Sequence, residues 1–188
     1  SNQQTLKSPV SLHGVGLHTG SHVTITMKPA NPGYGIRFQR IDLPEQPVVK
    51  ADADLVVDTS RGTTLEYNGA RVSTVEHVLS ALVGLQIDNV LIELDGPEIP
   101  ILDGSAREFV EKLIKAGIKE LSEDRDYFEI EESISFKDDE SGAELMIFPS
   151  EDFQLTTMID FNSSVLGHQY ASLKSITDYE KEIAPCRT

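Results

Sequence analysis

The chain has 188 residues, of which 39% are hydrophobic and 25% are charged, and it contains no tryptophan. This length predicts one large domain or two small ones, with a hydrophobic core that needs no disulfide. The net charge of −15 argues against nucleic-acid binding, because such a surface repels phosphate backbones. The single cysteine, Cys186, predicts a reducing compartment, which we take to be the cytoplasm. No run of about 18 apolar residues is present, so no stable membrane insertion is expected.

The first half of the chain begins with strand patterns. Apolar and polar residues alternate at Val23–Met27 and again around Ile36 and Phe38, which predicts two half-buried strands. Asn68-Gly69 separates two more strand-like runs, Thr63–Tyr67 and Arg71–Val72, and predicts a tight hairpin.

Two amphipathic helices are predicted next, with a strand at Val90–Leu94 between them. The first helix covers Val75–Val83 and ends near Gly84, and the second runs from Ser105 to about Ala116. Gly117 is a suitable residue to end the second helix. Each helix starts with an S-x-x-E sequence, which predicts capping boxes at Ser73/Glu76 and Ser105/Glu108.

Mixed rather than strictly alternating strands and helices predict an α+β fold, with a sheet and its helices in two layers. A polar segment at Lys119–Asp126 predicts a boundary between a first domain, residues 1–122, and a second, residues 123–188. The second region contains strand patterns at Tyr127–Ile130, Ser133–Phe136, Ala143–Phe148 and Phe153–Ile159 and a short helix at Ile176–Ile183. So little helix cannot cover a sheet, so we expect an incomplete second domain of similar type.

Glu76 and His77 are the residues of most chemical interest, and their spacing leaves two interpretations open. At 100° per residue, an apolar stripe faces the core and His77 points nearly opposite to it. In the first interpretation Glu76 caps the helix and His77 is a solvated surface residue. In the second, the adjacent glutamate and histidine resemble metallohydrolase helices, where one residue binds zinc and the other accepts a proton. The stripe consists of Val75, Val78, Leu79, Leu82 and Val83.

The helix alone cannot supply a complete zinc site. The helical motif H-E-x-x-H needs a second histidine four residues from the first, but Ser73 and Ala81 occupy those positions around His77. His13, His18, His22 and His168 are the other histidines. His18 and His22 would lie about 13 Å apart in extended chain, too far to share one metal. Any further ligands must come from elsewhere in the fold.

Four ordered motifs resemble one enzyme family. They are "GVGLHTG" at 14–20, "STVEHVLSAL" at 73–82, "IDNVLIEL" at 87–94 and "PEIPILDGSA" at 97–106. Together they resemble the UDP-3-O-acyl-N-acetylglucosamine deacetylases, zinc-dependent amidohydrolases of lipid A (lipopolysaccharide) biosynthesis. The resemblance covers essentially the whole chain. It implies two similar α+β domains, with the active site between them.

The resemblance also implies roles for individual residues. His77 matches a zinc ligand and Glu76 the general base, while His18 matches a histidine of the substrate-binding region. Thr188, in "CRT", matches a threonine that stabilises the oxyanion. The segment Ser60-Arg61-Gly62 departs from the family and leaves the lining of the pocket open. The substrate implied is a UDP-acyl-sugar, and some members are fused to a hydroxyacyl dehydratase.

The remaining ligands of the family, a histidine and an aspartate in H-x-x-x-D, are expected beyond Thr188. His77 alone would hold zinc weakly, because catalytic zinc sites use three protein ligands. We therefore expect the 188-residue chain to be inactive by itself. Two alternatives remain: a non-catalytic module that binds a UDP-sugar or an acyl chain, and an α+β domain whose motifs are accidental. Metal-dependent activity that requires downstream residues would favour the enzyme.

Overall fold

The computed structural model describes residues 1–188 and has an α+β fold, as predicted. Its contacts divide the chain into two compact units. The first contains residues 1–124 together with 179–188, and the second contains residues 125–178. The predicted domain boundary at 122/123 lies close to the first division, but the structure packs the last ten residues, 179–188, onto the first unit.

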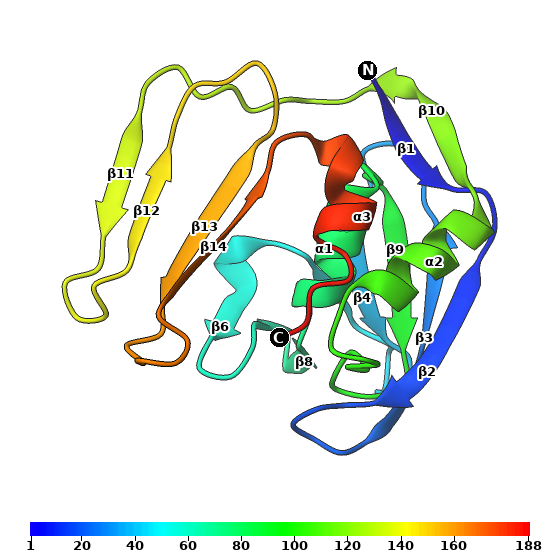
Figure 1. Cartoon of the computed structure of the whole chain (residues 1–188). Coiled ribbons are helices and arrows are strands. Elements are labelled where there is room, and N and C mark those ends of the chain that lie inside the picture. The colour runs from blue at the N-terminus through cyan, green and yellow to red at the C-terminus, as the bar shows by residue number, and fades with distance from the viewer. The chain divides into compact units, whose positions relative to one another are not determined.

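A five-stranded sheet in the order β2-β3-β9-β4-β5 forms the centre of the first unit (Figure 1). Its pairs are antiparallel except β4 and β9, which run parallel. Side chains that point to one face are buried at alternate positions, as a sheet covered on one side requires. Its strands are β2 (Val10–Val15), β3 (His22–Pro29), β4 (Ile36–Arg40), β5 (Val48–Lys50) and β9 (Val90–Leu94).

Two helices, α1 (Glu76–Gly84) and α2 (Arg107–Ala116), contact each other and lie over the sheet (Figure 1). Both were predicted to within two residues at each end, and Gly117 ends α2 with a positive φ of 80°. One residue of the predicted apolar stripe was wrong: Val83 is 53% exposed. The core between sheet and helices includes Ile25, Met27, Phe38, Val78, Leu82, Ile92, Phe109 and Leu113.

Two smaller sheets complete the first unit. β1 (Asn2–Leu6) pairs with β10 (Ile118–Asp124), and β6 (Val56–Asp58), β7 (Thr64–Tyr67) and β8 (Ala70–Ser73) form a three-stranded sheet after the 3₁₀ helix η1 (Ala53–Leu55). The turn between β7 and β8 is the predicted hairpin. Asn68 and Gly69 have φ of 48° and 77°, which is the left-handed geometry that this sequence favours.

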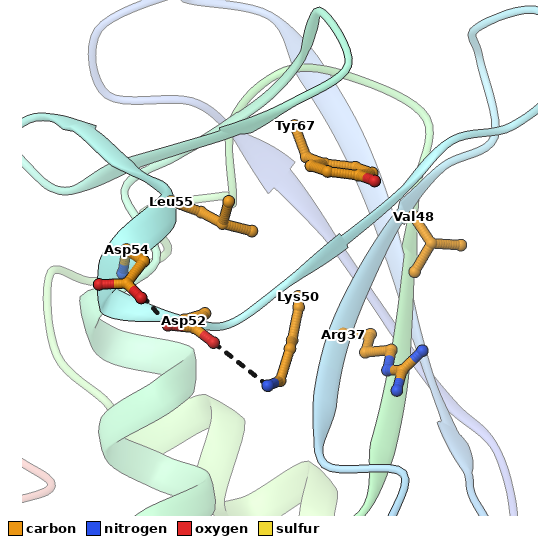
Figure 2. A pocket seen from close by; sticks show the side chains of 7 residues that line it. All are labelled: Arg37, Val48, Lys50, Asp52, Asp54, Leu55 and Tyr67. Atoms are coloured by element: carbon orange, nitrogen blue, oxygen red, sulfur yellow. Dashed lines mark hydrogen bonds and ion pairs between the residues drawn. The ribbon is translucent and has the colours of Figure 1, made fainter.

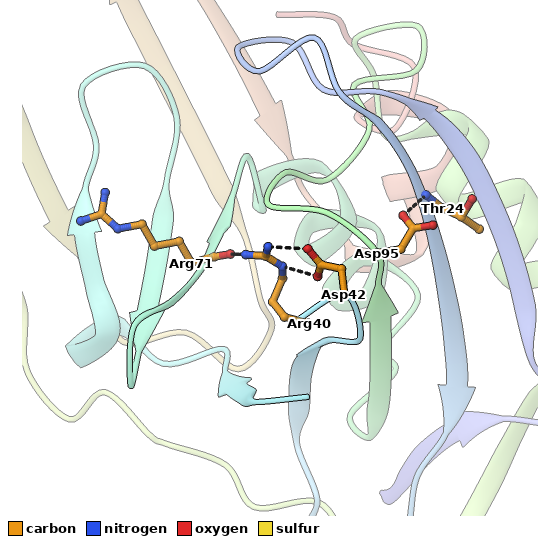
Figure 3. A network of polar contacts seen from close by, with 5 residues as sticks. All are labelled: Thr24, Arg40, Asp42, Arg71 and Asp95. Carbon is orange, nitrogen blue, oxygen red and sulfur yellow. Dashed lines mark hydrogen bonds and ion pairs between the residues drawn. The ribbon is translucent and has the colours of Figure 1, made fainter. Parts of the chain in front are cut away.

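A buried arginine connects the five-stranded and three-stranded sheets (Figure 3). Arg40, at the end of β4, binds both carboxylate oxygens of Asp42 at 2.9 and 2.8 Å. Its remaining nitrogen donates to the backbone carbonyl of Arg71 in β8 at 2.6 Å. The paired geometry satisfies the guanidinium away from water, and the Arg40 contact lowers the pKa of Asp42. This network fixes β8, the strand that leads into α1.

The second unit consists mainly of two antiparallel hairpins (Figure 1). β11 (Ile134–Lys137) pairs with β12 (Glu144–Ile147), and β13 (Leu155–Asp160) pairs with β14 (His168–Leu173). The strand predicted at Tyr127–Ile130 was wrong, since the structure has no strand at these residues. The helix predicted at Ile176–Ile183 is split into the 3₁₀ helix η2 (Ile176–Asp178) and α3 (Tyr179–Glu182). None of the helices is long and apolar enough to cross a membrane.

Candidate active site

Glu76 and His77 form the first turn of α1, which puts both side chains at the end of the helix near β8. Glu76 is exposed and His77 is half-buried, while their neighbour Val78 faces the core. The predicted capping box was wrong. Ser73 bonds instead to the hydroxyl of Thr64 at 2.9 Å, and the Glu76 carboxylate accepts a hydrogen bond from the backbone N–H of Thr63. Thr64 on β7 and Thr63 just before it thus replace the local cap, and the Glu76 carboxylate is held by the chain that precedes β7.

The capping box at Ser105/Glu108 was also wrong. Ser105 is buried, and its hydroxyl accepts from the N–H of Arg107 at 3.2 Å while donating to Asp103 at 2.7 Å. Ala106 occupies the cap position of α2 and provides no side-chain hydrogen bond. The Ser105 hydroxyl is the main cause of a lowered pKa at Asp103.

The loop at 61–63 brings His18 and Glu76 into one region. His18 Nε2 lies 2.8 Å from the carbonyl oxygen of Arg61, so Nε2 carries the proton that is donated. Two residues later, the Thr63 N–H donates to Glu76. Gly62 lies between these contacts, and a Cβ built there would be 3.5 Å from a Glu76 oxygen. The segment 61–63 therefore links two of the predicted site residues.

Glu98 is a buried carboxylate beside this loop, and the sequence analysis did not identify it. It is 0% exposed, and it accepts from the N–H groups of His18 and Thr19 and from the hydroxyls of Thr19 and Thr74 at 2.8–3.2 Å. Burial by itself would raise the pKa of Glu98, but these hydrogen bonds outweigh burial and hold the pKa below 4.5. Glu98 stands between Pro97 and Ile99 in a loop without a periodic pattern. Nothing in the local sequence therefore marks this glutamate as buried.

Thr188 is attached by its backbone to the loop that leads into α2. Its backbone N–H donates to the carbonyl of Gly104 at 3.1 Å, and the N–H of Ala106 donates to Ala184 at 3.0 Å. The segment 179–188 is therefore attached to the first unit by backbone hydrogen bonds at both places. No hydrogen bond joins Thr188 to His18, Glu76 or His77 within residues 1–188.

Within residues 1–188, no group of three or more His, Cys, Asp or Glu side chains could hold a metal ion. His77 would contribute one ligand, and the other histidines lie on different elements. His13 and His22 are exposed on β2 and β3, and His168 is paired with Asp160 at 3.2 Å in β14. The residues of this chain therefore do not form a metal site by themselves.

A pocket of the first unit contains none of the predicted site residues (Figure 2). It has a volume of about 330 Å³ and lies between β4, β5, η1 and β7. Lys50 is paired with Asp52 at 3.1 Å, and the Arg37 guanidinium stacks over Tyr34 at 4.4 Å from the ring centre. Lys50 is therefore already ion-paired within this pocket. Its lining residues are Arg37, Val48, Lys50, Asp52, Asp54, Leu55 and Tyr67.

Residues 3–188 match the family model described as LpxC, UDP-3-O-acyl N-acetylglycosamine deacetylase. The chain belongs to this deacetylase family. It is 44% identical to a bifunctional enzyme LpxC/FabZ of Bacteroides thetaiotaomicron over 99% of the chain and 40% of that relative. It is also 44% identical to the UDP-3-O-acyl-N-acetylglucosamine deacetylase of Myxococcus xanthus over 100% of the chain and 59% of that relative. The chain thus spans only part of the family members it matches.

Proposed function

We propose that this chain is the N-terminal part of a zinc-dependent amidohydrolase that removes the N-acetyl group of a UDP-3-O-acyl-N-acetylglucosamine, in lipid A biosynthesis. The observation that carries the proposal is the pair Glu76-His77 at the start of α1, joined to His18 through the loop 61–63. Membership of the deacetylase family supports it. The cytoplasmic location stays a prediction.

In this proposal, zinc belongs to the longer protein. His77 would supply one ligand and the remaining ligands would come from residues beyond Thr188, because residues 1–188 contain no group of three. When bound, zinc polarises the scissile carbonyl and lowers the pKa of water.

Glu76 is suited to act as the general base. The Thr63 N–H occupies one carboxylate oxygen and fixes its orientation, while the second oxygen has no hydrogen-bond partner within residues 1–188. That second oxygen would accept the proton of the attacking water as the new C–O bond forms. Glu76 would then return this proton to the departing nitrogen as the C–N bond breaks, giving acetate and a free amine. General bases of this kind contribute about 10²–10⁴-fold in rate.

His18 and Thr188 would handle the substrate and the oxyanion. The carbonyl of Arg61 engages His18 Nε2 and so leaves Nδ1 as the ring nitrogen that would face a polar group of the substrate. The Thr188 hydroxyl would donate to the oxyanion. Loss of one such donor costs about 10²–10³-fold in rate.

The test uses the full-length protein and compares it with residues 1–188. We expect the full-length protein to bind zinc and release acetate from the UDP-acyl-sugar, and residues 1–188 to do neither. Glu76→Gln should lower kcat by about 10²-fold or more without loss of zinc. His77→Ala should lose zinc. Glu108→Gln, which changes a glutamate in the first turn of α2, is the matched control and should leave kcat unchanged.

Two results would overturn the proposal: a full-length protein that releases no acetate, or a Glu76→Gln variant as active as the parent. Substrate binding without acetate release would instead support the non-catalytic binding module. Fusion to a hydroxyacyl dehydratase stays a prediction, compatible with the bifunctional relatives, and the length of the encoded protein tests it.

A further inference from the structure

We propose that Glu98 is a positioning residue that holds two parts of the proposed active site in register, the His18 loop and the turn that begins α1. The proposal rests on the proposed function, because it assigns Glu98 a role in the geometry of Glu76, His77 and His18. Glu98 would not touch the substrate. It would act through the backbone of His18 and through Thr74.

The first observation is a fully buried carboxylate without a cation. No lysine or arginine pairs with Glu98 within residues 1–188, and its side chain is 0% exposed. Burying an unpaired charge is costly unless hydrogen bonds compensate it. Here the bonds come from two separate segments, His18-Thr19 and Thr74. These donors need an acceptor at this position, so a single buried carboxylate ties the two segments together.

The second observation is a strained turn two residues before Glu76. Thr74 has a φ of 59°, a left-handed conformation that β-branched residues rarely adopt. Three contacts hold it there. Its hydroxyl donates to Glu98 at 2.8 Å, its N–H donates to the carbonyl of Thr63 at 3.0 Å, and the preceding Ser73 forms a bridge with Glu98. Such strain persists only where the surroundings enforce it, and it is concentrated at functional sites.

The third observation is the close packing of the His18 loop on Glu98. A Cβ at Gly16 would collide with the Glu98 carboxylate and the Thr19 hydroxyl, so glycine allows the loop to approach this closely. The loop then presents His18 to the Arg61 carbonyl at 2.8 Å. The Glu98 carboxylate thus contacts both the backbone of His18 and the hydroxyl of Thr74, which lies two residues before Glu76. Movement of Glu98 would displace both parts of the site together.

A matched pair of variants at Thr74 in the full-length protein tests whether the hydrogen bond between Thr74 and Glu98 positions the site. Thr74→Val keeps the branched shape and removes only the hydroxyl that donates to Glu98, whereas Thr74→Ser keeps the hydroxyl. We expect Thr74→Val and Glu98→Gln to lower kcat by about 10–100-fold, the effect of an ångström-scale misplacement. KM should change less than about 3-fold, because uniform binding is not removed. Thr74→Ser should keep kcat within about 3-fold of the parent, because the serine hydroxyl can still donate to Glu98 and hold the geometry.

Further measurements separate positioning from a general loss of structure. Zinc content should stay at the parental level in all these variants, and backbone amides of residues 18 and 19 should exchange hydrogen faster in Glu98→Gln. Asp95→Asn is the control, since Asp95 is an exposed carboxylate that holds the Thr24 N–H at 2.7 Å without contacting the site. It should leave kcat and the exchange at residues 18 and 19 unchanged.

Parental kcat in Glu98→Gln would overturn the inference, as would a Thr74→Ser variant as impaired as Thr74→Val. If Glu98→Gln does not fold, the Thr74 pair decides. An inactive parent would refute the proposed function, and the exchange of residues 18 and 19 would then still show whether Glu98 fixes the loop.

Discussion

The ionisation of Glu98 makes the stability of the folded protein depend on pH. Hydrogen bonds outweigh burial and place its pKa in the folded protein below the usual 4.5. The folded state therefore binds the proton less tightly than the unfolded state. Ionised Glu98 therefore stabilises the folded protein fully above pH 4.5. This stabilisation is lost as the pH falls through the pKa of Glu98 in the folded protein.

Glu98→Gln should remove this pH-dependent stabilisation. A neutral amide cannot accept all the hydrogen bonds, so we expect a loss of about 1–3 kcal/mol in the free energy of unfolding at pH 7. The difference between variant and parent should shrink as the pH falls below 4.5. Urea unfolding at several pH values measures it. A difference that is the same at pH 7 and pH 3 would show that ionised Glu98 does not stabilise the fold.

Local sequence rules were weakest at the residues of the proposed site. Ser73 and Glu76 satisfy the capping-box sequence, but Thr64 on β7 and Thr63 just before it offer partners that the rule does not consider. Glu98 has no periodic context, and its partners lie 24 to 80 residues away in the chain. The positive φ of Thr74 opposes its own propensity. Such departures from local preference are expected where function sets the geometry.

At the level of elements, patterns with a strong period or a defined turn were predictable. The 3.6-residue period gave α1 and α2, alternation gave β3, β4 and β9, and Asn68-Gly69 gave the hairpin between β7 and β8. β10 was instead interpreted as a boundary, because its Lys119–Asp124 sequence is polar on both faces and pairs only with β1. A polar strand with one neighbour leaves no alternation to detect.

The contact between α1 and α3 provides a prediction for the segment that carries Thr188. Gly84 leaves room for the ring of Tyr179, whose hydroxyl bonds to Ser80 at 2.6 Å, and a Cβ at Gly84 would collide with that ring. Alanine would favour the helix by about 1 kcal/mol, but overpacking should cost more, about 1–3 kcal/mol. We expect Gly84→Ala to lower stability and the rate of deacetylation, because the segment 179–188 is displaced.

A double-mutant cycle tests this contact. Tyr179→Ala vacates the space that the new methyl group needs, so the combined variant should lose less stability than the sum of the single variants. Tyr179→Phe is the control that removes only the hydrogen bond, for about 0.5–1.5 kcal/mol. Additive losses in urea unfolding, within about 0.5 kcal/mol, would show that the ring and Gly84 do not interact.

At the scale of the whole molecule, the sequence predicted a second region with too little helix to cover its strands, and its hairpins indeed expose large apolar side chains. Soluble proteins rarely leave a large contiguous apolar surface uncovered. The chain spans 40% of a bifunctional relative and 59% of the Myxococcus relative, so in those proteins further chain is available to cover such strands. The exposed residues include Phe136, Leu145, Phe148, Leu155, Met158 and Tyr170.

We therefore expect residues 1–188 alone to bind a hydrophobic dye and to self-associate as their concentration rises, and the full-length protein to do neither. Met158 and Tyr170 face each other across β13 and β14 and are 74% and 80% exposed. Replacing both with lysine should reduce dye binding by residues 1–188 but destabilise the full-length protein, where the pair would be covered. Val57→Lys, at a 51% exposed position on β6 of the first unit, is the control and should have little effect on either protein. A double variant that leaves the stability of the full-length protein unchanged would mean that this face stays exposed to solvent there, and that the covering chain lies elsewhere.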